Sequence, residues 1–186
     1  MAYKLLDVNG KDVTHHDLQD KGVWCVSGAS QEEGFVQKYG KDLSLVINPA
    51  KETDPYVPDL KNTDTGTIAD LKTQNTPFFQ SKSRFGIDPQ FAVVFNGKDR
   101  ERYKRLYPDI DIYFAVDWQV VGFESGNNKT IVQPMVGVWR IPFKELDKIL
   151  DSAPFHEYQQ RVGDTKGNAK GSYVLDLQNS AFKRVV

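Results

Sequence analysis

Two short segments in the middle of the chain alternate between sheet-favouring and polar residues. They cover residues 57–61 and 67–73, and the five residues between them, NTDTG, are rich in turn formers. Alternation with a period of two, interrupted by a turn, predicts an antiparallel hairpin. One arm carries an aspartate and the other carries Asp-x-Lys. The hairpin is therefore either a solvated surface ribbon or part of a binding site.

A helix is predicted just upstream of the hairpin. The sequence SQEE at residues 30–33 has the Ser-x-x-Glu form of a capping box, which satisfies backbone amides at a helix start. Gly40 suits the left-handed conformation that ends many helices. Apolar side chains recur three, four and seven positions after Glu32, on one helical face: Phe35, Val36 and Tyr39.

The rest of the chain mixes strand and helix patterns without an internal repeat. Runs rich in β-branched and aromatic residues predict the strands, and helical spacing predicts the helices. The fold class that fits is α/β, with a central mixed sheet flanked by helices. Strands are predicted at 3–8, 43–47, 90–95, 110–118, 120–124, 130–140 and 173–177, and helices at 98–106 and 143–150.

The amino-acid composition is typical of a soluble globular protein. Its 186 residues suit one domain over 1–186, with 39% hydrophobic and 26% charged residues. No run approaches the ~18 apolar residues of a membrane span, and the first residues lack the apolar stretch of a signal peptide. A single cysteine, Cys25, in an apolar stretch is expected to be a buried, inert thiol. We therefore expect an intracellular, cytoplasmic protein without a membrane partner.

Net charge gives little support for a nucleic-acid partner. The formal charge is −1, so the chain as a whole does not attract phosphate. The densest basic segment is KDRERYKR at 98–105, with five basic residues against two acidic ones. Such a helix is usually a solvated face, and phosphate contact is the alternative.

The charged residues of the hairpin are the main candidates for chemistry. On a strand, Asp70 and Lys72 share a face, and Leu71 presents its backbone carbonyl sideways. If the turn centres on residues 64 and 65, Asp59 lies opposite Asp70, and the two carboxylates are roughly 5 Å apart. Such a pair repels unless a divalent cation holds it, and oxygen ligands favour Mg²⁺ or Mn²⁺. Lys72 is then placed to orient water or to hold a phosphate.

A third acid is expected from the upstream helix. Glu32 shares the apolar stripe, where an acid needs a partner, whereas Glu33 fits the capping box. The alternative for Glu32 is a carboxylate that simply interacts with the helix macrodipole.

These residues, taken together, resemble the PD-(D/E)XK nuclease superfamily. Its pattern is a glutamate on the first core helix, Pro-Asp at one strand and Asp/Glu-x-Lys on the next, here Glu32, Pro58-Asp59 and Asp70-Leu71-Lys72. The resemblance implies a restriction-endonuclease-like core at about 28–118, completed by residues 119–186. It also implies a metal held by Asp59, Asp70, Leu71 and Glu32. Gln74 resembles a polar residue that contacts phosphate or water in many members.

The resulting hypothesis is a Mg²⁺-dependent or Mn²⁺-dependent DNA nuclease, with endonuclease action favoured over exonuclease action. Its catalytic residues would be Asp59, Asp70, Lys72, Glu32 and Gln74. The segments INPAKETDPYVPDL and DLKTQNTPFF also resemble uncharacterised phage and prophage proteins. The alternative is a non-catalytic nucleic-acid-binding or phage assembly protein on the same scaffold. Both hypotheses are compatible with a homodimer.

Overall fold

The computed structural model of the protein describes residues 3–14, 21–157 and 171–186, with backbone alone over 21–30. Its largest sheet has the strand order β12-β9-β6-β4-β3-β2. The central pair, β4 and β6, is parallel, and the other neighbours are antiparallel, so the sheet is mixed. The strands are β2 (Leu45–Ile47), β3 (Leu60–Asn62), β4 (Ile68–Gln74), β6 (Asp111–Asp117), β9 (Val136–Pro142) and β12 (Lys183–Arg184).

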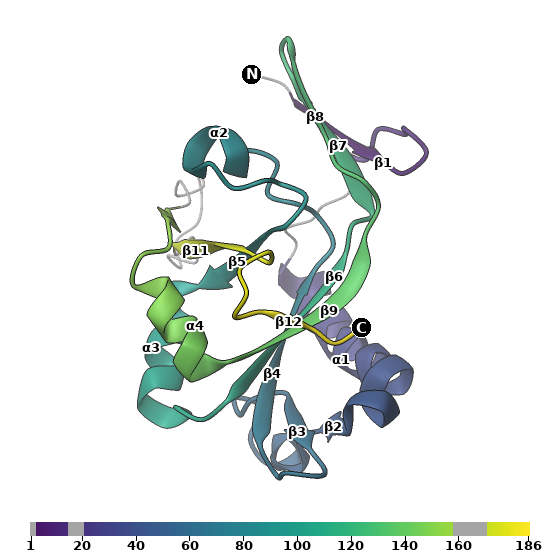
Figure 1. Ribbon diagram of the computed structural model, residues 1–186. Helices are drawn as coiled ribbons and strands as arrows, with labels where there is room; N and C mark the ends of the chain where they lie inside the picture. The colour runs from purple at the N-terminus through teal and green to yellow at the C-terminus, as the bar shows by residue number, and fades with distance from the viewer. Residues whose placement is uncertain (1–2, 15–20, 158–170) are drawn as a thin grey trace.

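Two smaller sheets lie beside the main one in the described residues. One has the order β1-β7-β8 and forms the arm at the top of Figure 1. The other has the order β10-β11-β5. Their strands are β1 (Tyr3–Asp7), β5 (Ala92–Asn96), β7 (Val120–Ser125), β8 (Asn128–Ile131), β10 (Phe155–His156) and β11 (Ser172–Asp176).

Helices cover both faces of the main sheet (Figure 1). Phe35 of α1 packs with Leu71 and Tyr113 on one face. On the other face, α3 and α4 pack against Ile112 and Phe114 in the larger core. The protein is therefore a mixed α/β fold with a mixed sheet flanked by helices, as expected. The helices are α1 (Lys21–Leu43), α2 (Ser81–Phe85), α3 (Gly97–Leu106), α4 (Phe143–Leu150) and the 3₁₀ turn η1 (Pro49–Glu52).

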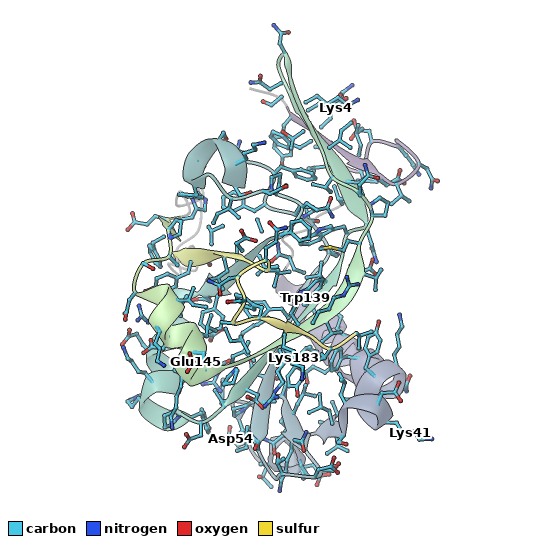
Figure 2. The ribbon with its side chains drawn as sticks, viewed as in Figure 1. Lys4, Lys41, Asp54, Trp139, Glu145 and Lys183 are labelled. Carbon is cyan, nitrogen blue, oxygen red and sulfur yellow. The ribbon has the colours of Figure 1, made fainter. Side chains whose placement is uncertain are left out.

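Burial follows the sheet and its covering layers. Trp139 of β9 is 5% exposed in the interior, whereas Lys4 and Lys41 point outward from β1 and α1 (Figure 2). None of the helices in the described residues combines the length and the apolar composition that a membrane span requires. The side chain of Cys25, predicted to be buried, lies outside the described residues.

The first core helix differs from its prediction at both ends. It begins at Lys21, nine residues before Ser30, so SQEE lies inside a helix and is not a capping box. It also continues through Gly40 to Leu43, and Ser44 takes the left-handed conformation, with φ 54°. Gly40 has a packing role instead, because a Cβ there would lie 2.6 Å from the Leu45 carbonyl oxygen.

A second difference is the strand predicted at 130–140, which is two strands in two sheets. β8 ends at Ile131 beside β7, and β9 begins at Val136 beside β6. Pro134 lies in the connection, where its missing N–H cannot continue a ladder. The chain therefore leaves one sheet and enters the other at this point.

Candidate functional site

The turn of the β3–β4 hairpin sets the register of the two arms. The Asn62 side chain accepts hydrogen bonds from the backbone amides of Asp64 and Thr65, each at 3.0 Å. Gly66 completes the turn with φ 74°. Leu60 then pairs with Ala69, which is the register expected from the sequence. Asp59, just before β3, therefore lies across from Asp70.

Asp59 reaches the backbone of the second arm through its carboxylate. Its Oδ2 accepts a hydrogen bond from the Leu71 amide at 3.3 Å. The N–H and C=O of one residue point to the same side of a strand, so the Leu71 carbonyl also faces the Pro58–Asp59 segment. The carbonyl is thus on the correct side of β4 to join Asp59 around an ion.

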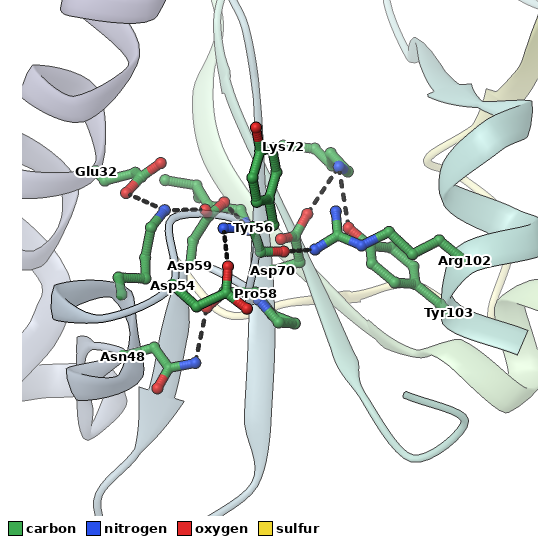
Figure 3. A network of polar contacts seen from close by, with 12 residues as sticks. Glu32, Asn48, Asp54, Tyr56, Pro58, Asp59, Asp70, Lys72, Arg102 and Tyr103 are labelled. Carbon is green, nitrogen blue, oxygen red and sulfur yellow. Dashed lines mark hydrogen bonds and ion pairs between the residues drawn. The ribbon is translucent and has the colours of Figure 1, made fainter. Parts of the chain in front are cut away.

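Asp70 and Lys72 form an ion pair that extends to α3. Lys72 Nζ lies 2.7 Å from Asp70 Oδ2 and 2.6 Å from Asp99 Oδ2. The same ammonium donates a hydrogen bond to the Tyr103 hydroxyl at 3.2 Å. Figure 3 shows Tyr103 reaching this group from α3, on the side opposite Glu32. The lysine is therefore held by groups from β4 and α3 together.

Glu32 approaches from α1 and meets Asp59 through a lysine that the sequence had not singled out. Lys51 Nζ lies 2.8 Å from Glu32 Oε2 and 2.5 Å from Asp59 Oδ1. Glu33 is exposed. Glu32 is thus the helix acid that faces the hairpin, but its present partner is an ammonium group.

Asn48 fixes the position of Lys51 relative to the hairpin. This residue is buried and precedes η1, which carries Lys51. Its side chain donates to the Pro58 carbonyl at 2.9 Å, and its backbone amide donates to the Asp59 carbonyl, also at 2.9 Å. The turn that holds the lysine is therefore attached directly to the Pro-Asp segment.

The two aspartates have opposite pKa shifts. Burial and the neighbouring charge of Asp70 raise the pKa of Asp59 to about 7, even though Lys51 favours its ionised form. Burial also opposes ionisation of Asp70, but the adjacent Lys72 outweighs it and holds the pKa of Asp70 below its ordinary value. Two carboxylates so close together do not both ionise easily without a further positive charge.

Lys72 is a firmly charged group in this arrangement. Burial disfavours its ammonium form, but Asp70, Tyr103 and Asp99 more than compensate and raise its pKa well above the ordinary value. A charged ammonium donates hydrogen bonds and cannot accept a proton. Lys72 is therefore suited to binding an anion or orienting water, not to acting as a general base.

The oxygen atoms around Asp70 fit a hard divalent cation. Asp70 Oδ2 is buried and lies 2.7 Å from the Lys72 ammonium, which is its ion-pair partner. Carboxylate oxygens of Asp59 and Asp70, with the Leu71 carbonyl, are the ligand type that Mg²⁺ and Mn²⁺ take. Within the described residues, no three acidic, histidine or cysteine side chains lie close enough together to hold one metal ion. The third acid, Glu32, is turned toward Lys51.

Gln74 has structural partners away from the acids. Its side-chain amide donates to the Thr76 carbonyl at 2.9 Å and accepts from the Val94 amide at 3.1 Å. Both contacts tie the end of β4 to neighbouring segments. The structure thus places Gln74 on the β4 strand that carries Asp70 and Lys72, with its amide occupied.

The basic segment on α3 divides into inward and outward residues. Arg100 is buried and pairs with Asp147 and Asp151 of the α4 region. Arg102 instead donates to the backbone carbonyl of Tyr56, which joins α3 to the loop before Pro58 (Figure 3). Part of this basic segment is therefore structural, and part borders the acidic site.

Three residues of the site were missed by the sequence analysis: Lys51, Asp99 and Tyr103. Asp99 and Tyr103 are four residues apart and so lie on one face of the predicted helix. This spacing could have indicated that both residues face the same neighbouring strand. Lys51 had no such signal, because its partners lie 19 residues before it and 8 residues after it.

Comparison with protein-family models, curated proteins and solved structures found no match to this chain. The geometry of the site is therefore the basis for any functional conclusion.

Proposed function

We propose that the protein is a divalent-metal-dependent DNA nuclease with a restriction-endonuclease-like core. The observation that carries the proposal is the buried Asp70 carboxylate, which lies across the hairpin from Asp59 and is ion-paired with Lys72 at 2.7 Å. The order of elements supports it as well. The helix, the first strand and the Asp-x-Lys strand are α1, β2 and β4, while Pro58-Asp59, predicted to lie on a strand over 57–61, directly precedes β3, which begins at Leu60.

In this proposal, Asp59, Asp70 and the Leu71 carbonyl hold Mg²⁺ or Mn²⁺, and Glu32 assists. The ion supplies Lewis-acid polarisation of a phosphoryl oxygen. Lys72 donates hydrogen bonds to the phosphate or to the attacking water, and Asp99 and Tyr103 hold its ammonium in place. Water adds to phosphorus while one P–O ester bond breaks, which leaves a phosphate monoester and a hydroxyl group.

The proposal is tested by incubating plasmid and linear duplex DNA with Mg²⁺ or Mn²⁺. Wild type is expected to cleave both substrates, and Asp70→Ala and Lys72→Ala are each expected to lose about 100-fold or more of the rate. Asp64→Ala, in the exposed hairpin turn, is the matched control and should retain activity. Circular dichroism confirms that each variant is folded. Cleavage that persists in both site variants contradicts the assignment. Cleavage of closed circular DNA distinguishes endonuclease from exonuclease action.

A second candidate function is favoured by Lys51. Its ammonium already forms ion pairs with Glu32 and Asp59, as expected of a scaffold that has lost its metal and serves as a non-catalytic binding or assembly protein. Under this function, calorimetry detects no Mn²⁺ binding, and wild type binds DNA or a protein partner without cleavage.

A further inference from the structure

Lys51 lies where two acids from different parts of the fold meet. Its Nζ contacts Glu32 Oε2 at 2.8 Å and Asp59 Oδ1 at 2.5 Å, and only about a fifth of its side chain is exposed. The contacts join η1 to α1 and to the Pro-Asp segment. A cation therefore already occupies the space between these two carboxylates.

The position of this ammonium is built into the backbone. Asn48 accepts from the Ala50 amide at 3.1 Å and so begins η1, while its own amide groups donate to the carbonyls of Pro58 and Asp59. Lys51 is three residues further on. The buried Asn48 thus positions the turn that carries Lys51 next to Asp59.

The other nearby ammonium cannot take over this role. Lys72 is engaged by Asp70, Asp99 and Tyr103. In the part of the chain that the structure describes, its ammonium contacts neither Glu32 nor Asp59. Within the described residues, Lys51 is the ammonium group that contacts both Glu32 and Asp59.

We propose that Lys51 is an exchangeable counter-ion, which holds Glu32 and Asp59 together without metal and leaves them when a divalent cation binds. This inference rests on the proposed function. An ammonium and a divalent cation repel each other and compete for the same carboxylate oxygens. Lys51 therefore weakens metal binding, and its release places a positive charge beside the site, where an anionic phosphodiester would bind.

The first test measures Mn²⁺ affinity by calorimetry for wild type, Lys51→Met and Lys61→Met. Lys61 is an exposed lysine on β3, so its removal changes the net charge equally without touching the acids. Lys51→Met is expected to bind Mn²⁺ about tenfold more tightly than wild type, and Lys61→Met to match wild type. Equal or weaker binding by Lys51→Met overturns the exchange.

The second test follows release of the lysine directly in wild-type protein. Amine acetylation of each lysine is measured by peptide mass spectrometry with and without Mg²⁺. The rate at Lys51 is expected to rise with Mg²⁺, because the ammonium loses both carboxylate partners, while the rate at Lys61 stays constant. An unchanged or slower rate at Lys51 shows a static ion pair and overturns the exchange.

The outcomes separate this inference from the nuclease proposal. Metal binding and cleavage by wild type, with no change in Lys51→Met, overturn the exchange alone. Absence of Mn²⁺ binding in both wild type and Lys51→Met overturns the exchange and the metal-dependent function together.

Discussion

At the scale of single residues, Asp59 and Asp70 differ although they lie opposite each other. Asp70 is 4% exposed and is ion-paired with Lys72, which keeps it charged. Burial and the charge of Asp70 raise the pKa of Asp59 to about 7. The pair is thus electrostatically unfavourable at neutral pH, because two neighbouring carboxylates repel each other when both are ionised.

The first prediction is that Asp59→Asn stabilises the metal-free protein at pH 8. The folded pKa of Asp59, about 7, is above its ordinary value of 3.8. The folded state therefore binds the proton more tightly, and the contribution of Asp59 to stability is fully present below about pH 4 and lost as pH rises through 7. Asparagine avoids this loss, with a gain of up to about 4 kcal/mol at pH 8, at about 1.4 kcal/mol for each pKa unit between 3.8 and 7, that disappears near pH 4.

Urea unfolding at several pH values in the presence of a chelator measures this gain. Asp64→Asn, in the exposed turn, is the control and should show no such pH dependence. A destabilisation by Asp59→Asn that is equal at pH 4 and pH 8 would contradict the pKa shift.

A second prediction concerns the Asp70–Lys72 pair. Lys72→Met leaves the buried Asp70 carboxylate without its cation and should lower the free energy of unfolding by about 3–5 kcal/mol. Adding Asp70→Asn should recover most of this loss, because the uncompensated charge is then gone. Denaturant unfolding of both single variants and the double variant gives the coupling energy. Additive effects would show that the two side chains do not interact.

At the scale of elements, the end of α1 depends on two residues with unusual requirements. Gly40 lies inside the helix, where the Leu45 carbonyl leaves no room for a Cβ. Ser44 follows the helix in a left-handed conformation that favours glycine. The sequence predicted that the helix ends at Gly40. A glycine required by close packing inside a helix cannot be distinguished in the sequence from a glycine that ends a helix.

The third prediction compares substitutions in this one helix. Gly40→Ala should destabilise the protein by about 1–3 kcal/mol, because the methyl group forces the β2 backbone away. Gly34→Ala is the matched control: nothing lies within 4 Å, so alanine should stabilise by up to about 1 kcal/mol. Ser44→Gly should stabilise by roughly 1 kcal/mol by relieving the left-handed strain.

Thermal unfolding with circular dichroism ranks these three variants. A gain in melting temperature for Gly40→Ala equal to that for Gly34→Ala would mean that the Gly40–Leu45 contact is not tight.

At the scale of the whole molecule, Arg100 joins three elements on one side of the main sheet. From α3 it contacts Asp147 of α4 at 2.7 Å and Asp151 just beyond that helix at 2.6 Å, and it donates to the Tyr173 hydroxyl of β11 at 3.0 Å. The same helix presents Asp99 and Tyr103 to Lys72. The contacts of Arg100 therefore help to hold α3 in the position from which Asp99 and Tyr103 reach Lys72.

The fourth prediction is that Arg100→Met destabilises the protein by about 2–3 kcal/mol. It removes several charge-assisted hydrogen bonds from a mostly buried side chain. Lys104→Met is the matched control, since Lys104 is half exposed and lies 3.3 Å from Asp147. Its loss should cost less than about 1 kcal/mol. Denaturant unfolding measures both variants, and equal effects would contradict the structural role of Arg100.

The sequence by itself determined the local parts of the site. The turn at 62–66 fixes the hairpin register, and period-two geometry then puts Asp59 across from Asp70 and Lys72 on the same face as Asp70. These relations depend on neighbours along the chain, so pattern and turn chemistry were sufficient. The α/β class followed from the same periodicities.

Only the tertiary structure decided which distant groups complete the site. Lys51 meets Glu32 across 19 positions, and Lys72 meets Asp99 across 27. Such contacts depend on how α1, η1 and α3 pack on the sheet, and no local pattern encodes that packing. The physical reason is that the charge balance of a partly buried site depends on which charged side chains the tertiary packing places beside it. Here the packing places the Lys51 ammonium between Glu32 and Asp59.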